Sequence, residues 1–107
     1  MSNDRHFRSR RQHQRLSLAL PVQLQNGDGV TRDVSTSGVF FETDLSFRAG
    51  SGITFSLILE HADPAGPIRV QCQGTVVRVE RVREGFGVAV AINRHRFDPM
   101  EATQGSA

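Results

Sequence analysis

The chain contains no lysine, tryptophan or tyrosine and only one cysteine, Cys72. A single cysteine excludes an intramolecular disulfide, and its place in a strand pattern predicts a small buried side chain rather than a reactive thiol. No apolar run is long enough for a signal peptide or a membrane span, so we expect a cytoplasmic protein without membrane insertion. Without Trp or Tyr, the seven Phe and the aliphatic residues must fill the core.

The absence of lysine means that all 13 basic side chains are arginine. Because a compositional bias of the genome explains such an absence equally well, the positions of the arginines matter more than their number. The net charge is +2, yet the first 15 residues carry five Arg and one acid, which is +4 and leaves −2 for the remainder. A basic arm of this kind either meets an anion or is simply solvated.

A length of 107 residues allows one domain. We divide the chain into a flexible basic arm (residues 1–15), a domain of strands (16–93) and a short polar tail (94–107). In the tail, Asp98-Pro99 could cap at most a helical turn. About six strands separated by turn signals, with no amphipathic helix, predict a small antiparallel β-barrel or sandwich.

Period-two alternation predicts the first strand from Leu16 to Leu24, with Pro21 facing outward at an edge or a bulge. A tight hairpin with positive φ is expected at residues 26–29. A strand is expected at Val30–Val34, followed by a break at 35–38 and by strands at 39–43 and 53–59. After a loop at His61–Pro67, we expect a long strand at Ile68–Val82 that is bent at Gly74, with Val77 and Val79 inward after the bend. The last strand is expected at Phe86–Ile92.

Two short polar motifs flank this first pair of strands. Arg11-x-x-x-Arg15 precedes the first strand, and Asp33-x-Ser35-x-x-Gly38 ends the second. Taken alone, the first could be a solvated tail and the second an ordinary Asx or Ser turn. Read as a site, Asp33 can accept the N1–H and N2–H bonds of guanine, Ser35 can bond a base or phosphate oxygen, and Gly38 permits close approach to the backbone.

Both motifs, in this order, resemble those of the PilZ domain, a bacterial receptor module for cyclic di-GMP. Residues 18–22, 74–79 and 85–90 also resemble strands of that family. The resemblance implies a six-stranded antiparallel barrel of the split-barrel type, with the nucleotide on its outer face and the arm clamped over it. It further implies that Arg11 and Arg15 bind phosphate and guanine, that Asp33, Ser35 and Gly38 hold a guanine, and that Arg10 goes with an intercalated pair of ligands. Arg78 is a further candidate contact.

The resulting hypothesis is a receptor that binds cyclic di-GMP and no other cofactor, and that signals to an unidentified protein by reordering its arm. The alternative is a PilZ-like protein-interaction module with weak or no nucleotide binding. A nucleic-acid binder is disfavoured, because the domain outside the arm is net negative and only one of the adjacent Phe40 and Phe41 can face outward. Catalysis and metal binding are not expected, since the four histidines lack metal-ligand spacing and no nucleophile has a positioned base.

Overall fold

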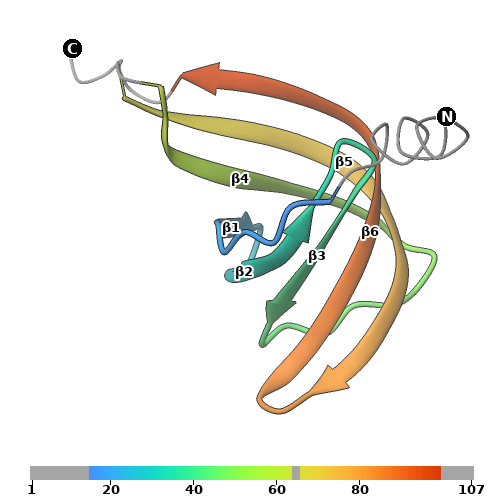
Figure 1. Cartoon of the computed structure of the whole chain (residues 1–107). Coiled ribbons are helices and arrows are strands. Elements are labelled where there is room, and N and C mark those ends of the chain that lie inside the picture. The colour runs from blue at the N-terminus through green and yellow to red at the C-terminus, as the bar shows by residue number, and fades with distance from the viewer. Residues whose placement is uncertain (1–14, 64–65, 100–107) are drawn as a thin grey trace, which may run out of the picture.

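Six antiparallel strands close into a barrel in the order β1-β2-β3-β6-β5-β4 (Figure 1). The computed structural model describes residues 15–63 and 66–99. The predicted six-stranded antiparallel barrel is therefore confirmed, and no helix occurs among these residues. The strands are β1 (Pro21–Leu24), β2 (Gly27–Val34), β3 (Gly38–Thr43), β4 (Gly52–Asp63), β5 (Gly66–Val82) and β6 (Gly85–Pro99). Within the described ranges, the structure contains no helix capable of crossing a bilayer.

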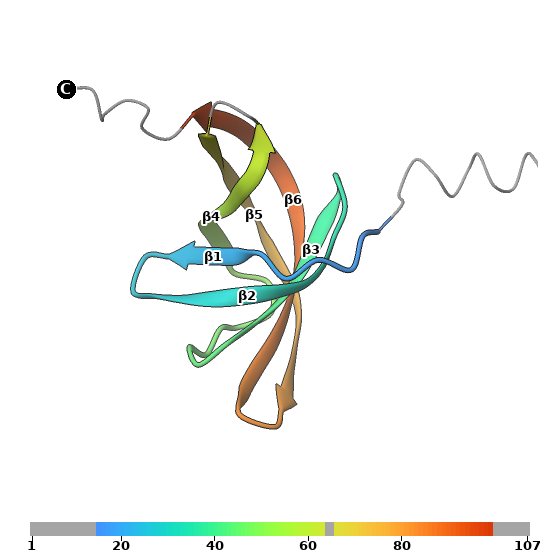
Figure 2. The same cartoon turned by 60° about the vertical axis from the view of Figure 1, so that its left-hand side comes forward.

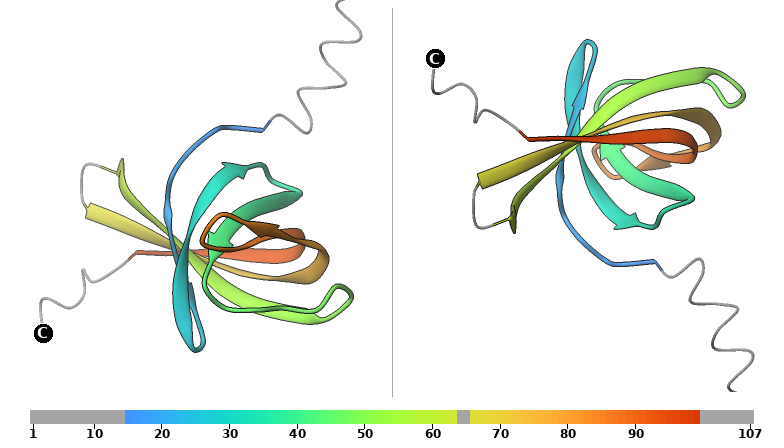
Figure 3. Two further views of the ribbon diagram at one scale, coloured as in Figure 1. Left: turned by 90° about the horizontal axis from the view of Figure 1, so that it is seen from below. Right: turned by 90° about the horizontal axis from the view of Figure 1, so that it is seen from above.

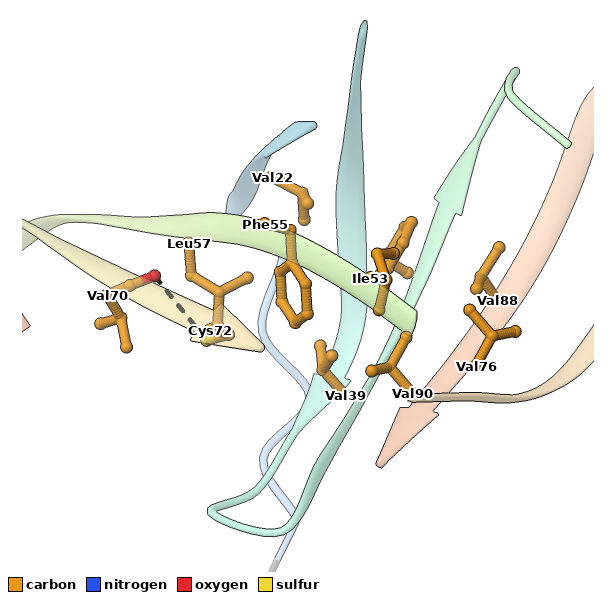
Figure 4. Packing of buried hydrophobic residues seen from close by; sticks show 11 residues of the cluster. Val22, Val39, Ile53, Phe55, Leu57, Val70, Cys72, Val76, Val88 and Val90 are labelled. Atoms are coloured by element: carbon orange, nitrogen blue, oxygen red, sulfur yellow. Dashed lines mark hydrogen bonds between the residues drawn. The ribbon is translucent and has the colours of Figure 1, made fainter. Parts of the chain in front are cut away.

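The barrel interior is filled by alternate residues of every strand, as the period-two patterns predict. Phe41 is the largest fully buried side chain and packs its ring against Phe55, 5.9 Å away between centroids. Valines from four strands surround these rings, namely Val22, Val39, Val76, Val88 and Val90 (Figure 4). Cys72 is 1% exposed, which confirms its predicted burial, and burial raises the pKa of its thiol to about 11.

Strands β4, β5 and β6 are much longer than the other three and continue beyond the barrel as a three-stranded sheet (Figures 1 and 2). Two irregularities bend the β5–β6 pair. One lies opposite Gln73 and Gly74, where Asn93 is the extra residue on β6, and the other makes Val77 the extra residue on β5. The predicted bend near Gly74 is thus present. The predicted inward position of Val77 is wrong, because its bulge leaves it 55% exposed while Val76 is buried.

The first predicted strand is shorter than its alternating pattern indicates. Only Pro21–Leu24 forms β1, and Pro21 is its first residue, where a missing N–H is tolerated. Residues 16–20, here called the strap, run along β2 (Figure 2). Leu16 exchanges two backbone hydrogen bonds with Val34, and the buried Thr31 hydroxyl accepts the N–H of Leu20 at 2.8 Å and donates to the Leu18 carbonyl. Leu16 remains 50% exposed.

Three other local predictions differ from the structure. The β1–β2 turn is formed by Gln25 and Asn26 without positive φ, because Gly27 already pairs with Leu24. The expected loop at 61–67 is mostly strand, since β4 reaches Asp63 and β5 begins at Gly66. The domain boundary expected at residue 93 falls inside β6, which pairs with β5 as far as Pro99. The helical turn that Asp98-Pro99 could cap would follow Pro99 and lies outside the described residues.

Candidate functional site

Four outward-facing residues of four different strands line up across the barrel wall. Asp33 of β2 pairs with Phe40 of β3, Phe40 pairs with Ala89 of β6, and Ala89 pairs with Arg78 of β5. Directly opposed residues of an antiparallel sheet point to the same face. We call this set the outer row. Barrel closure therefore brings together two predicted site residues, Asp33 and Arg78, that lie 45 positions apart in sequence.

Arg15 enters this site from the end of the arm. The strap fixes its position, because Leu16 is bonded to Val34 of β2, the residue after Asp33. Both Nε and Nη2 of Arg15 donate to Oδ1 of Asp33, at 2.8 and 2.6 Å. The two side chains are 49% and 33% exposed, so solvent screens the pair and it adds about 1 kcal/mol or less to stability. The two predicted motifs thus meet in one ion pair.

Ser35 has a clear role in the turn between β2 and β3. Its side-chain oxygen accepts the N–H groups of Ser37 and Gly38 at 3.2 Å each, and it donates to the Gly38 carbonyl at 3.3 Å. Ser35 is also only 8% exposed, so its hydroxyl faces the loop backbone and not the solvent. This is the local capping that small hydroxyl residues provide in turns.

Gly38 begins β3 at the rim of the site and pairs with Ala91. Its φ is not in the left-handed region, so glycine is needed here for space and not for backbone conformation. A Cβ at this position would lie 2.9 Å from the carbonyl oxygen of Val90. Gly38 therefore lets β3 approach β6 closely at the point where the motif ends.

Phe40 and Arg78 interact across the small Ala89 between them. The Arg78 guanidinium carbon lies 5.8 Å from the centroid of the Phe40 ring, within cation–π range, and Arg78 Nε is 3.7 Å from Glu80. The tip of the ring covers Gly87, where a Cβ would lie 2.5 Å from Cζ. Small residues on β6 thus leave room for an aromatic ring and an arginine on the outer face.

A pocket of about 550 Å³ follows the outer row. Its walls include Arg15, Asp33, Gly38, Phe40 and Arg78, so four of the predicted site residues border one cavity. Ser35 is not part of the pocket wall, but its hydroxyl accepts the N–H of Gly38, which is. Arg10 and Arg11 lie outside the described residues.

Phe40 is an aromatic pocket residue that was not predicted to belong to the site. Two signals in the sequence could have found it. Only one of the adjacent Phe40 and Phe41 could face outward, and Gly87, Ala89 and Ala91 form a small-residue face on the last strand. Only the β3–β6 register shows that Phe40 lies opposite that face, next to Asp33.

Comparison with known proteins identifies the family and a similar fold. The family model for the PilZ domain matches residues 9–105. No significant match was found among curated proteins. One similar solved structure is the Bacillus subtilis inhibitor of motility (MotI/DgrA), with a TM-score of 0.70 and 19% identity over 81% of this chain. At this identity the likeness concerns the fold, and this chain spans 44% of that one. The chain belongs to the PilZ domain family, a family of binding domains that act as receptors for cyclic di-GMP.

Proposed function

We propose that this domain binds cyclic di-GMP in the pocket along the outer row. The observation that carries the proposal is the Arg15–Asp33 pair at the wall of that pocket, because it joins the end of the basic arm to the motif on β2. A phosphodiester with two guanines needs both an anion-binding fork and a carboxylate for the N1–H and N2–H edge. Arg15 supplies the anion-binding fork, and Asp33 supplies the carboxylate.

Both groups keep capacity for a ligand while paired. Arginine has five N–H donors, and Arg15 directs two of them at Asp33. Both bonds end on Oδ1 of Asp33, so Oδ2 can accept from a guanine. Arg78 and the Phe40 ring extend the surface on which a purine could stack, since guanidinium groups and aromatic rings both pack against bases.

The arm completes the site in this proposal. Arg11 would bind phosphate or guanine from the opposite side of the ligand, and Arg10 would allow an intercalated pair of nucleotides. Charge-assisted hydrogen bonds contribute roughly 1.5–3 kcal/mol each. A few of them offset the roughly 1–2 kcal/mol per residue that ordering a short backbone segment costs. The repositioned arm would then present a new surface to a downstream protein.

Titration calorimetry with cyclic di-GMP tests the site. Wild type should bind close to two nucleotides per chain, and Arg10→Ala should bring this ratio down toward one. Arg15→Ala and Asp33→Ala should each weaken binding about 10- to 100-fold, because each removes charge-assisted bonds to the ligand.

Arg32→Ala is the matched control for these variants. Arg32 is an exposed β2 arginine that pairs with Glu42 at 2.5 Å, outside the pocket walls. Arg32→Ala removes the same charge as Arg15→Ala and a similar ion pair. Because solvent screens this exposed charge, the affinity for cyclic di-GMP should change less than about threefold. Equal weakening by Arg15→Ala and Arg32→Ala would reduce the effect to net charge and contradict the proposed site.

A specific observation also favours the second candidate, a protein-interaction module with weak nucleotide binding. The Arg15 and Asp33 side chains already form an ion pair with each other, and the Ser35 hydroxyl is engaged in its turn, so part of their bonding capacity is used without a ligand. A wild-type titration without heat or arm movement would support this function instead.

A further inference from the structure

The last part of β6 has an open edge. The ladder between β3 and β6 ends where Gly38 pairs with Ala91 and Ile92 donates to the Ser37 carbonyl. Residues 94–99 then pair with β5 on one side, and no strand of residues 15–63 or 66–99 covers their other side. Figure 1 shows this segment as the red arrow at the border of the projecting sheet. An edge of this kind offers backbone N–H and C=O groups to another strand.

The side chains on this edge alternate in a definite way. Arg94, Arg96 and Asp98 share one face of the sheet, and Asp98 Oδ2 accepts bonds from both Arg96 and Gln71. His95 and Phe97 share the other face and pack edge to face, 5.6 Å between ring centroids. Phe97 is 59% exposed, the highest value among the large apolar side chains of the described residues.

This alternation is self-complementary in one antiparallel register. A two-fold axis perpendicular to the sheet puts two copies of the strand side by side with matching faces, so each residue opposes one of its own parity. With Phe97 on the axis, the two Phe97 rings oppose each other. Arg96 then opposes Asp98 of the second copy, and Asp98 opposes its Arg96. Centring on Arg96 instead would still oppose Arg94 to Asp98, but it would place the two Arg96 side chains against each other, which is unfavourable, and would separate the two Phe97 rings.

We infer that the β6 edge is a homodimer interface, on which a second copy of this chain adds its β6 antiparallel and centred on Phe97. Two three-stranded extensions then form one continuous sheet, with an aromatic pair on one face and two Arg96–Asp98 ion pairs on the other. The existing contacts permit this, since both bonds to Asp98 end on Oδ2, and Oδ1 can accept from the partner arginine. The interface lies on a different part of the chain from the nucleotide pocket.

The charges on β6 favour a second copy that pairs through its own β6 edge, because Arg96 and Asp98 then oppose each other twice. The edge of β4, the opposite border of the same extension, carries Glu60 and would accept β6 in a head-to-tail manner. Such an arrangement does not close and would give larger assemblies. Charged residues and a terminal proline can also serve simply to keep an edge monomeric.

Cysteine cross-linking of the full chain tests the register. Phe97→Cys places two thiols opposite each other on the axis, at a separation that a disulfide can span. Val77→Cys is the control, because Val77 is 55% exposed but lies away from the edge. The native Cys72 is buried and should not react. Under mild oxidation we expect a covalent dimer from Phe97→Cys at least about tenfold faster than from Val77→Cys; equal rates, or no dimer, would overturn the interface.

Charge exchange tests it without any new covalent bond. Sedimentation velocity over a concentration series should show a reversible dimer of the wild type. Arg96→Asp and Asp98→Arg should each raise the dimer dissociation constant at least about tenfold, since both create two like-charge pairs. The double variant should recover the wild-type value. Arg94→Asp, on the same face but outside the central pairs, should have little effect.

The remaining outcomes contradict the proposal in distinct ways. A wild type that stays monomeric at all concentrations would mean that the charges protect the edge. Species larger than a dimer would indicate head-to-tail addition of β6 to β4. Failure of the double variant to recover dimerisation, with its circular dichroism spectrum unchanged, would exclude the Arg96–Asp98 pairs.

Discussion

Single glycines determine how closely the strands of this barrel approach one another. Gly74 lies where β5 leaves the barrel wall, and a Cβ there would lie 2.2 Å from the carbonyl oxygen of Ala91 and 2.9 Å from a Val90 methyl. The first contact is with backbone, which cannot rotate away as a side chain can. Gly74 is therefore required by packing, since its φ lies outside the left-handed region.

We expect Gly74→Ala to destabilise the fold by about 1–3 kcal/mol, the usual cost of forcing an extra carbon into a packed site. Gly52→Ala is the matched control, because its nearest neighbour would be 3.9 Å from the added Cβ. Urea unfolding followed by circular dichroism measures both. Equal stability of the two variants would show that β5 and β6 separate at Gly74 without cost.

At the scale of elements, the side chain of Thr31 holds the strap on β2, where a regular ladder of backbone hydrogen bonds is absent. Thr31 is 1% exposed, and its hydroxyl bonds the backbone of Leu18 and Leu20. Two residues before Leu18, Leu16 bonds Val34 through both its N–H and its C=O. Because Arg15 directly precedes Leu16, the strap also fixes the position of the arginine that meets Asp33.

Thr31→Val should therefore cost about 1–3 kcal/mol of stability, since it removes two part-buried hydrogen bonds, to the Leu20 N–H and the Leu18 carbonyl, while keeping the side-chain shape. Thr54→Val, on the exposed face of β4, should change stability by less than about 0.5 kcal/mol. Denaturant midpoints compare the two. A neutral Thr31→Val would mean that the strap does not depend on the hydroxyl.

The strap also shows why its sequence pattern misled. Leu16, Leu18 and Leu20 continue the alternation of β1, so periodicity alone extends the strand to Leu16. Alternation reports which side chains share a face, but not whether a neighbouring strand is present to bury them. The same reasoning explains β6, where the polar residues after Ile92 indicated a tail although β5 was long enough to pair with them.

At the scale of the whole molecule, the sequence predicted the fold and the types of residue in the site better than the site's arrangement. Turn signals and alternation were sufficient for six antiparallel strands, and the two motifs contain Arg15 and Asp33, which the fold brings into one ion pair. The outer row could not be predicted, because it depends on the registers of three strand pairs. Two of these registers, β2–β3 and β5–β6, include a bulge, and a bulge shifts which residues oppose each other.

The closure of the barrel leads to a last prediction. Strand β1 joins β4 through only two residue pairs, Val22 with Leu57 and Gln23 with Ser56, whereas β5 and β6 pair along almost their whole length. Figure 3 views this arrangement from both ends. Local opening requires breaking only the contacts of the segment that moves, so a short seam opens at lower free energy than a long ladder.

Native-state hydrogen exchange by NMR should therefore find amides of Val22 and Gln23 opening at a free energy about 2 kcal/mol or more below that of Val88 and Val90. The difference should persist although Val22 and Val88 are both fully buried, because burial of a side chain does not fix how many strand contacts its segment must break. Cyclic di-GMP should slow exchange in the strap and β1 if it binds through Arg15, since the ligand then ties that segment to β2. Uniform exchange across all six strands would instead mean that the barrel opens only as a whole, and that the strap cannot move independently of the fold.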